Sequence, residues 1–163
     1  MRMNGGGDLT LTRAWMQSLP GRLPPEGRVV VLTGPWTFSA TISSVGYLKQ
    51  AGKDRVVLVG ESPGDRLSFF AEGRPIFLPN SGATVLMATG RHDYIEGCRG
   101  FADCHPQVVV SPIAVKSLAP DVPAPWTLET YVQGRDPGME AAARVLGKGG
   151  TTSAGRLPAP SMR

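Results

Sequence analysis

The sequence predicts one α/β domain over residues 1–147, followed by a disordered tail over residues 148–163. Residues 28–33 and 55–60 are apolar runs with unbroken valine and leucine cores. Such runs are typical of strands in a parallel sheet, because helices cover both faces of that sheet. Between them, residues 40–50 have the pattern of a helix. Strand, helix and strand in this order form a βαβ unit, which indicates the fold class.

Composition narrows the classes of function. The 163 residues are 41% apolar and 18% charged, which is typical of a globular domain. The net charge of +4 comes from scattered basic residues that are not interleaved with aromatic residues, so we expect no nucleic-acid partner. No apolar run reaches the roughly 20 residues that span a bilayer. Residues 1–20 contain no apolar segment of a secretory signal, and the sequence leaves localisation unknown.

The first predicted helix covers residues 9–19 and ends at Pro20-Gly21. Its apolar residues fall near one face: Leu9, Leu11, Trp15, Met16 and Leu19. The glycine triplet Gly5–Gly7 comes directly before it. Such a triplet normally follows a strand, which this sequence lacks. We therefore expect the chain to start inside a larger protein and to contain only part of its domain.

The elements after residue 60 are shorter. A turn-forming sequence separates two predicted strands, and a loop that carries both histidines and both cysteines follows them. A proline-rich connection then precedes the last helix. In order, we predict strands over 74–78 and 83–88, a loop over 90–106, one interrupted strand over 108–110 and 113–115, a connection over 120–125 and a helix over 140–146.

Ser39 is the leading candidate for a catalytic residue. It stands where the strand over 28–33 gives way to the helix over 40–50. A helix N-terminus has unpaired N–H groups and the positive end of the helix dipole, and both favour negative charge that develops on a nearby group. A serine at this position is a candidate nucleophile, although a capping serine is also common there.

An oxyanion site would complete this chemistry. Acyl transfer needs N–H donors aimed at the oxygen that becomes negative. The amide of Ala40, which follows the serine, is one candidate donor. The loop Gly5–Gly7 is the other, because glycines let the backbone approach a substrate closely.

Five segments together resemble the C-terminal processing (tail-specific) serine peptidases, in the right order and over residues 1–147. The oxyanion strand-loop of that family is similar to Arg2-Met3-Asn4-Gly5-Gly6-Gly7, and its nucleophile turn to Val31-Leu32-Thr33 with Thr37-Phe38-Ser39-Ala40. Three more segments match its later motifs: Val57-Leu58-Val59-Gly60-Glu61 with Gly64, Leu78-Pro79-Asn80-Ser81-Gly82, and Pro120-Asp121-Val122.

The resemblance implies a Clp-protease/crotonase-type superhelix of ββα units and a serine-type peptidase. Ser39 would be the nucleophile, and the amides of Ala40 and of Gly6 (or Gly7) would hold the oxyanion. The family acts on peptides or proteins without a cofactor, is compatible with a homo-oligomer, and is often periplasmic or secreted.

One departure from the family concerns the general base. The usual lysine after the glycine is replaced, since the segment reads Gly64-Asp65-Arg66. Arginine stays protonated and cannot accept the serine proton, and Asp65 alone is a poor base. Tricorn-like relatives use a histidine upstream of the oxyanion strand, a region that we expect to precede Met1. Within the chain His92 is the leading imidazole and His105 the weaker one, with Glu61 and Glu96 as candidate supporting carboxylates.

Two alternative functions, from classes other than peptidases, stay open. The same scaffold suits a non-catalytic protein that binds peptides, or a crotonase-like enzyme that stabilises an acyl-CoA enolate. The glycine triplet lacks the Gly-Lys-Ser/Thr ending of a phosphate loop, and no spacing of histidines and carboxylates suits a catalytic metal. The cysteines Cys98 and Cys104 could form a local disulfide or stay as free thiols.

Overall fold

Parallel strands with a helix between them form the centre of the molecule, as the sequence predicts. The computed structural model describes residues 1–99 and 101–147, so the predicted tail over 148–163 lies outside the described residues. Strand β1 (Val29–Thr33) pairs with β2 (Val56–Gly60), and α2 (Ala40–Gly52) connects them. A third parallel strand, β5 (Val122–Pro123), adds to the far side of β2 and gives the order β1-β2-β5.

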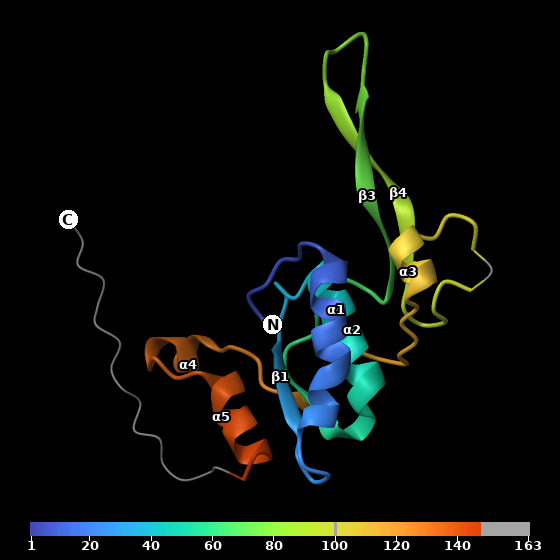
Figure 1. Ribbon diagram of the computed structural model, residues 1–163. Helices are drawn as coiled ribbons and strands as arrows, with labels where there is room; N and C mark the ends of the chain where they lie inside the picture. The colour runs from blue at the N-terminus through green and yellow to red at the C-terminus, as the bar shows by residue number, and fades with distance from the viewer. Residues whose placement is uncertain (100, 148–163) are drawn as a thin grey trace.

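Helices lie on both sides of this small sheet. Helix α1 (Leu9–Ser18) packs alongside α2, and α5 (Pro137–Val145) contacts β1 and β2. In Figure 1, α1 and α2 lie on one side of β1 and α5 lies on the other. The chain therefore has the layered arrangement of a mixed α/β domain with a parallel sheet. None of its helices, within the described ranges, has the length and apolar character needed to cross a membrane.

Helix α2 is buried over almost its whole surface, because α1, the sheet and the segment after β4 surround it. Two of its buried serines are hydrogen-bonded: Ser44 Oγ lies 2.6 Å from Thr12 Oγ1, and Ser43 Oγ lies 2.6 Å from Tyr94 Oη. Around it the buried core contains Met16, Val31, Ile42, Val45, Tyr47, Leu48, Val56, Leu58, Tyr94, Cys98, Cys104, Val108, Ile113, Val115 and Leu118.

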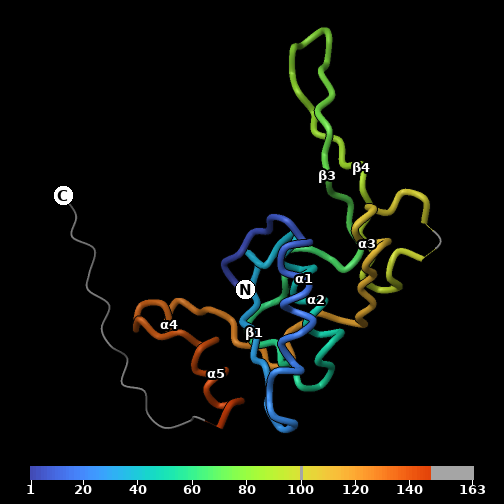
Figure 2. Tube along the Cα trace, in the orientation of Figure 1, coloured from blue at the N-terminus to red at the C-terminus, as the bar shows by residue number. Residues whose placement is uncertain are grey.

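A long antiparallel hairpin projects from this core, and we call it the arm. It consists of β3 (Ser68–Phe77) and β4 (Thr84–Asp93), and Figures 1 and 2 show it extending well beyond the helices. Towards its tip, no other element of the described residues covers the arm, and Phe77 and Leu86 are 72% and 74% exposed. Its base lies against the core, where His92 and Tyr94 are buried.

Two segments differ in secondary structure from the prediction. The expected strand over 108–110 is wrong, because these residues belong to helix α3 (Pro106–Val110). Pro106 occupies the first turn, where proline favours a helix, and His105 O accepts hydrogen bonds from the amides of Val108 and Val109 at 2.9 and 3.2 Å. Residues 113–115 form no strand.

Other boundaries shift or appear anew. The strands of the arm extend beyond 74–78 and 83–88, so the loop predicted from residue 90 starts with strand residues. Within the predicted connection, β5 forms because Asp121 Oδ2 accepts from Leu58 N at 2.8 Å and aligns it with β2. The sequence also gave no prediction of α4 (Leu128–Val132), which Thr127 caps, or of the short 3₁₀ turns η1 (Leu19–Arg22) and η2 (Lys53–Arg55).

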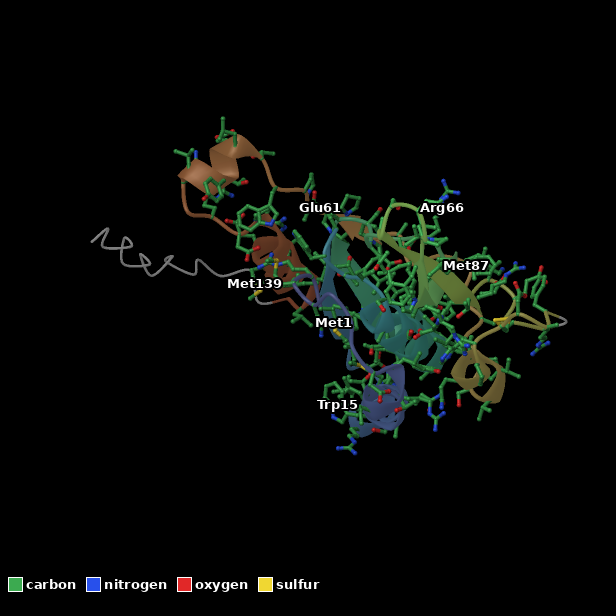
Figure 3. The ribbon with its side chains drawn as sticks, turned by 90° about the horizontal axis from the view of Figure 1, so that it is seen from above. Met1, Trp15, Glu61, Arg66, Met87 and Met139 are labelled. Atoms are coloured by element: carbon green, nitrogen blue, oxygen red, sulfur yellow. A yellow bond between two sulfur atoms is a disulfide. The ribbon has the colours of Figure 1, made fainter. Side chains whose placement is uncertain are left out.

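The apolar face predicted for the first helix is only partly buried. Leu9 and Met16 are buried, whereas Leu11 and Trp15 are exposed. The apolar stripe is wider than the contact with α2, so its margins face solvent. Cys98 and Cys104 form a disulfide, seen as a yellow bond in Figure 3, which settles the alternative left open by the sequence.

Candidate functional site

Ser39 occupies a strained backbone conformation between β1 and α2. Its φ of 51° and ψ of −129° place it in a region that residues other than glycine rarely adopt. Such strain persists only where neighbouring contacts hold the chain, and it gathers at functional sites. Here Thr37 supplies those contacts: its Oγ1 accepts from Gly34 N at 3.0 Å, and its carbonyl accepts from Gly64 N at 3.0 Å.

The N-terminal segment runs beside this turn. Asn4 O accepts from Phe38 N at 3.3 Å, and Met1 O accepts from Thr37 Oγ1 at 3.3 Å. The guanidinium of Arg2 donates to both carboxylate oxygens of Asp136, at 2.7 and 2.5 Å, and so fixes the segment to the start of α5.

Gly6 lies directly against Ser39. A Cβ atom on Gly6 would come within 2.7 Å of Ser39 Cβ and 3.1 Å of Ser39 Oγ, and the φ of Gly6 is +122°. Only glycine fits there without a shift of the backbone, because both the close approach and the positive φ exclude a side chain. The structure thus brings together the two features that the sequence pairs, the glycine loop and the serine turn.

The three backbone amides that are candidate oxyanion donors differ in their hydrogen bonding. Among the described residues, no acceptor bonds the amide of Ala40, as expected for the first residue of a helix. The Gly6 amide, in contrast, donates to Asn4 Oδ1 at 3.0 Å. No hydrogen bond within the described ranges involves the Gly7 amide. Within the described ranges, the Ala40 and Gly7 amides are therefore without an acceptor, whereas the Gly6 amide would have to leave Asn4 Oδ1 before it could bind another group.

The hydroxyl of Ser39 is half-exposed and makes no hydrogen bond with any other part of the described chain. In particular, neither histidine bonds to it there. Asp65, which stands at the position of the family's lysine, is half-buried, and its carboxylate accepts from the amide of Arg66 at 2.7 Å.

The segment that carries Asp65 nevertheless lies close to the serine turn. Gly64 packs against it so closely that a Cβ would lie 2.1 Å from Pro35 O. Asp65 and Arg66 line a cavity of about 230 Å³ together with Ile42 and Lys116. Ile42 stands one turn after Ser39 in α2, so this cavity adjoins the serine turn. Lys116 was not anticipated, because nothing in its local sequence relates it to Gly64.

His92 lies in a buried cluster at the base of the arm. Its Nδ1 is 3.0 Å from Tyr94 Oη, and its Nε2 is 3.3 Å from Glu72 Oε1. The ring stacks between Phe69 and His105, with centroid distances of 4.9 and 5.2 Å. Burial, and after it the neighbouring His105, lowers the pKa of His92 despite the opposing effect of Glu72. Burial also raises the pKa of Tyr94.

A cavity connects this cluster with the glycine loop. Its volume is about 460 Å³, and Gly7 lies on its wall together with Asp8, Leu9, Thr10, Glu72, His105 and Gln107. His105, rather than His92, is the imidazole that lines the cavity. Since Gly7 follows the glycine that contacts Ser39, the cavity and the serine turn are neighbours.

The two candidate supporting carboxylates, Glu61 and Glu96, belong to residues whose hydrogen bonds do not involve Ser39 in the described part of the chain. Glu61 follows β2, where its backbone amide donates to Thr33 O at 3.2 Å. Glu96 is exposed, and its amide donates to Asp93 Oδ1 at 3.1 Å. The sequence did not indicate Glu72, because its partners in the cluster are remote along the chain. For Tyr94 one pattern was available: it stands two residues after His92, hence on the same side of extended chain.

Comparison of the chain with protein-family models finds no match, and comparison with the sequences of curated proteins finds none either.

Proposed function

We propose that this chain carries the catalytic serine of a serine-type peptidase, and that Ser39 attacks the carbonyl carbon of a peptide bond. The observation that carries the proposal is the contact of a strained Ser39 with Gly6, where a Cβ atom would come within 2.7 Å of the serine Cβ. A serine on a sharp strand-to-helix turn is exposed towards substrate and lies beside unpaired helix amides.

The resemblance to C-terminal processing peptidases supports this reading. In that family the fold is of the Clp-protease/crotonase type, and the mixed α/β arrangement with parallel strands is compatible with it. The segments similar to the family's oxyanion loop and nucleophile turn adjoin each other in space, through the contact of Gly6 with Ser39.

The chemistry follows from these positions. As Ser39 Oγ forms a bond to the carbonyl carbon, its proton passes to a general base and the carbonyl electron pair moves onto oxygen. The amide of Ala40 and a second amide of the glycine loop stabilise that oxyanion. Collapse breaks the C–N bond, the amine leaves with a proton, and water then hydrolyses the serine ester. We leave the general base unassigned, with Asp65 and His92 as candidates from the sequence.

A second candidate is a non-catalytic protein that binds peptides on the same surface. The observation that favours it is the serine hydroxyl, which no imidazole or lysine contacts by a hydrogen bond in the described ranges. An acyl-CoA enzyme would use the same amide donors without a nucleophile.

Labelling with a fluorophosphonate probe tests the proposal. The folded chain should react at Ser39, as located by peptide mass spectrometry, and Ser39→Ala should abolish the label. Ser81→Ala removes an exposed hydroxyl from the turn at the tip of the arm and should leave labelling unchanged. A folded protein that stays unlabelled would overturn the peptidase proposal, and a rise in melting temperature with acyl-CoA would then favour the enolate alternative.

Two glycine substitutions provide a matched test of the geometry. Gly6→Ala introduces the clash with Ser39 and should slow labelling by about 100-fold, the effect of removing one oxyanion donor. Gly5→Ala meets nothing within 4 Å and should retain the rate. Equal rates for the two variants would show that Gly6 does not shape the reactive site.

A further inference from the structure

Three metal-binding side chains converge at the base of the arm. Glu72 comes from β3, His92 from β4, and His105 from the residue before α3. One ligand atom from each lies within 4.8 Å of the other two. Ligand atoms of a tetrahedral zinc site are about 3.3 Å apart, as follows from bond lengths of about 2.0–2.1 Å. The 3.3 Å between His92 Nε2 and Glu72 Oε1 already has that value.

Glu72 reaches this cluster through an unusual backbone. Side chains alternate along a strand, so a regular β3 would direct Glu72 to the face opposite Phe69, the residue that pairs and stacks with His92. Instead Glu72 has a φ of 57°, and its carbonyl accepts from Thr89 Oγ1 at 2.8 Å. The register of the arm is the same on both sides of this position. The strained backbone therefore redirects one carboxylate and interrupts the pairing at Glu72 alone, while the register of the strands is unchanged.

His92 has the support that zinc-binding histidines usually have. Its Nδ1 is hydrogen-bonded to Tyr94 Oη, which is hydrogen-bonded in turn to Ser43. Such a contact fixes the ring and leaves the other nitrogen for a metal.

His105 contributes a buried nitrogen without a partner. Its Nδ1 atom is buried and has no hydrogen-bond partner within the described ranges. An unpaired buried nitrogen is costly unless another group satisfies it. The backbone around His105 is also fixed, because its amide donates to Arg91 O at 2.8 Å and the preceding Cys104 is bridged to Cys98.

From these observations we propose that Glu72, His92 and His105 bind a zinc ion. Two imidazoles and one carboxylate form a set of three protein ligands, which leaves the fourth position open. Two of the three ligands, Glu72 and His105, line the cavity of about 460 Å³ that also borders Gly7. The ion would join both strands of the arm to α3, and it would place a positive charge beside the glycine loop. The proposal does not depend on Ser39 being a nucleophile.

Calorimetric titration with zinc tests the site. The chain is used without a histidine tag, with its disulfide oxidised, after treatment with a chelator and dialysis. One zinc per chain should bind, and His105→Ala and Glu72→Gln should each weaken binding at least tenfold. Glu96→Gln removes an exposed carboxylate from the neighbouring loop and should bind zinc as the parent does. Absence of binding, or an unchanged affinity in His105→Ala, would overturn the proposal.

The absorption spectrum of bound cobalt(II) and the melting temperature provide a second test of the site. Cobalt(II) in the same oxidised chain should give the visible absorption of a tetrahedral site, and zinc should displace it. Zinc should raise the melting temperature of the parent and of Glu96→Gln but not that of His105→Ala, provided that the variant is folded by circular dichroism. Binding that appears only after reduction would assign the metal to Cys98 and Cys104 and reject the histidine site.

Discussion

The strands of the βαβ core and of the arm both contain large apolar residues but bury them to very different extents. Leu58 in β2 is fully buried, whereas Leu86 in β4 is 74% exposed. Each leucine stands opposite a residue of a paired strand, Val31 for Leu58 and Pro75 for Leu86, so strand pairing alone does not explain the difference in burial. The difference lies in what packs on the faces of the strands: helices cover β1 and β2, whereas no element that the structure describes covers the arm towards its tip. An isolated two-stranded hairpin is marginally stable in water, so the arm depends on its base.

Truncation of core leucines should have the largest effect. Leu58→Ala leaves a cavity between the sheet and α2 and should lower the free energy of unfolding by about 3 kcal/mol. Leu86→Ala in the arm is the matched substitution and should change it by less than about 0.5 kcal/mol. Urea unfolding followed by circular dichroism measures both values. Similar losses would mean that the tip of the arm is packed in solution.

Removal of the disulfide should have the next largest effect, because it fixes the segment between the arm and α3. Replacing both Cys98 and Cys104 by alanine should cost about 2 kcal/mol, the value expected for closing so short a loop. Urea unfolding of the parent with and without a reductant provides the comparison. The double variant should not respond to the reductant, and a parent that does not respond either would place the bridge outside the cooperative unit.

Asp136→Asn, at the start of α5 beside the core, should have a smaller effect on the free energy of unfolding. It removes the charge that pairs with Arg2 while retaining a capping residue for α5, so we expect a loss of about 1 kcal/mol at neutral pH. The hydrogen bonds from Arg2 lower the pKa of Asp136 below its ordinary value of 3.8. The pair therefore stabilises the fold above pH 3.8, and this contribution is lost as the pH falls through the lowered pKa.

Unfolding at several pH values checks this prediction. The difference between the parent and Asp136→Asn should shrink as the solution is acidified below the ordinary pKa of the carboxyl group. Asp54→Asn, at an exposed position of η2, serves as the control and should show no such convergence. A constant difference would mean that the charge of Asp136 contributes nothing.

Shortening the arm should have the smallest effect on stability. Residues 75–86 are replaced by Asn-Gly, which joins the opposed residues Arg74 and Met87 by a two-residue turn. We expect the free energy of unfolding to change by less than about 0.5 kcal/mol. Solubility should rise, because the exposed apolar tip is removed. A large loss of stability would show that the tip supports the core.

The same contrast explains what the sequence could predict. The runs 28–33 and 55–60 predicted β1 and β2 because burial on both faces requires unbroken apolar residues. The base of the arm was missed because Glu72 and Gly73 interrupt the apolar pattern. At α3, Pro106 and the hydrogen bonds to His105 O outweigh the strand propensity of three consecutive valines.

In the candidate site, too, some features could be predicted from the sequence and others could not. The contact between Gly6 and Ser39 was predictable, because glycine loops and serine turns have recognisable local sequences. Nothing in the local sequence indicated that the φ of Ser39 is positive, since neither of the residues beside it is a glycine. The cluster of Glu72, His92 and His105 depends on the pairing of β3 with β4 and on a redirected side chain, so no spacing along the sequence reveals it.

The ion pair between Arg2 and Asp136 joins regions that the ribosome makes at very different times. Residues emerge in order, at about 5–20 per second, and folding starts before synthesis ends. The βαβ unit is complete once β2 has emerged, yet the segment that carries Gly6 gains its anchor only when α5 begins. During synthesis, Ser39 is therefore in place before the glycine loop is held against it.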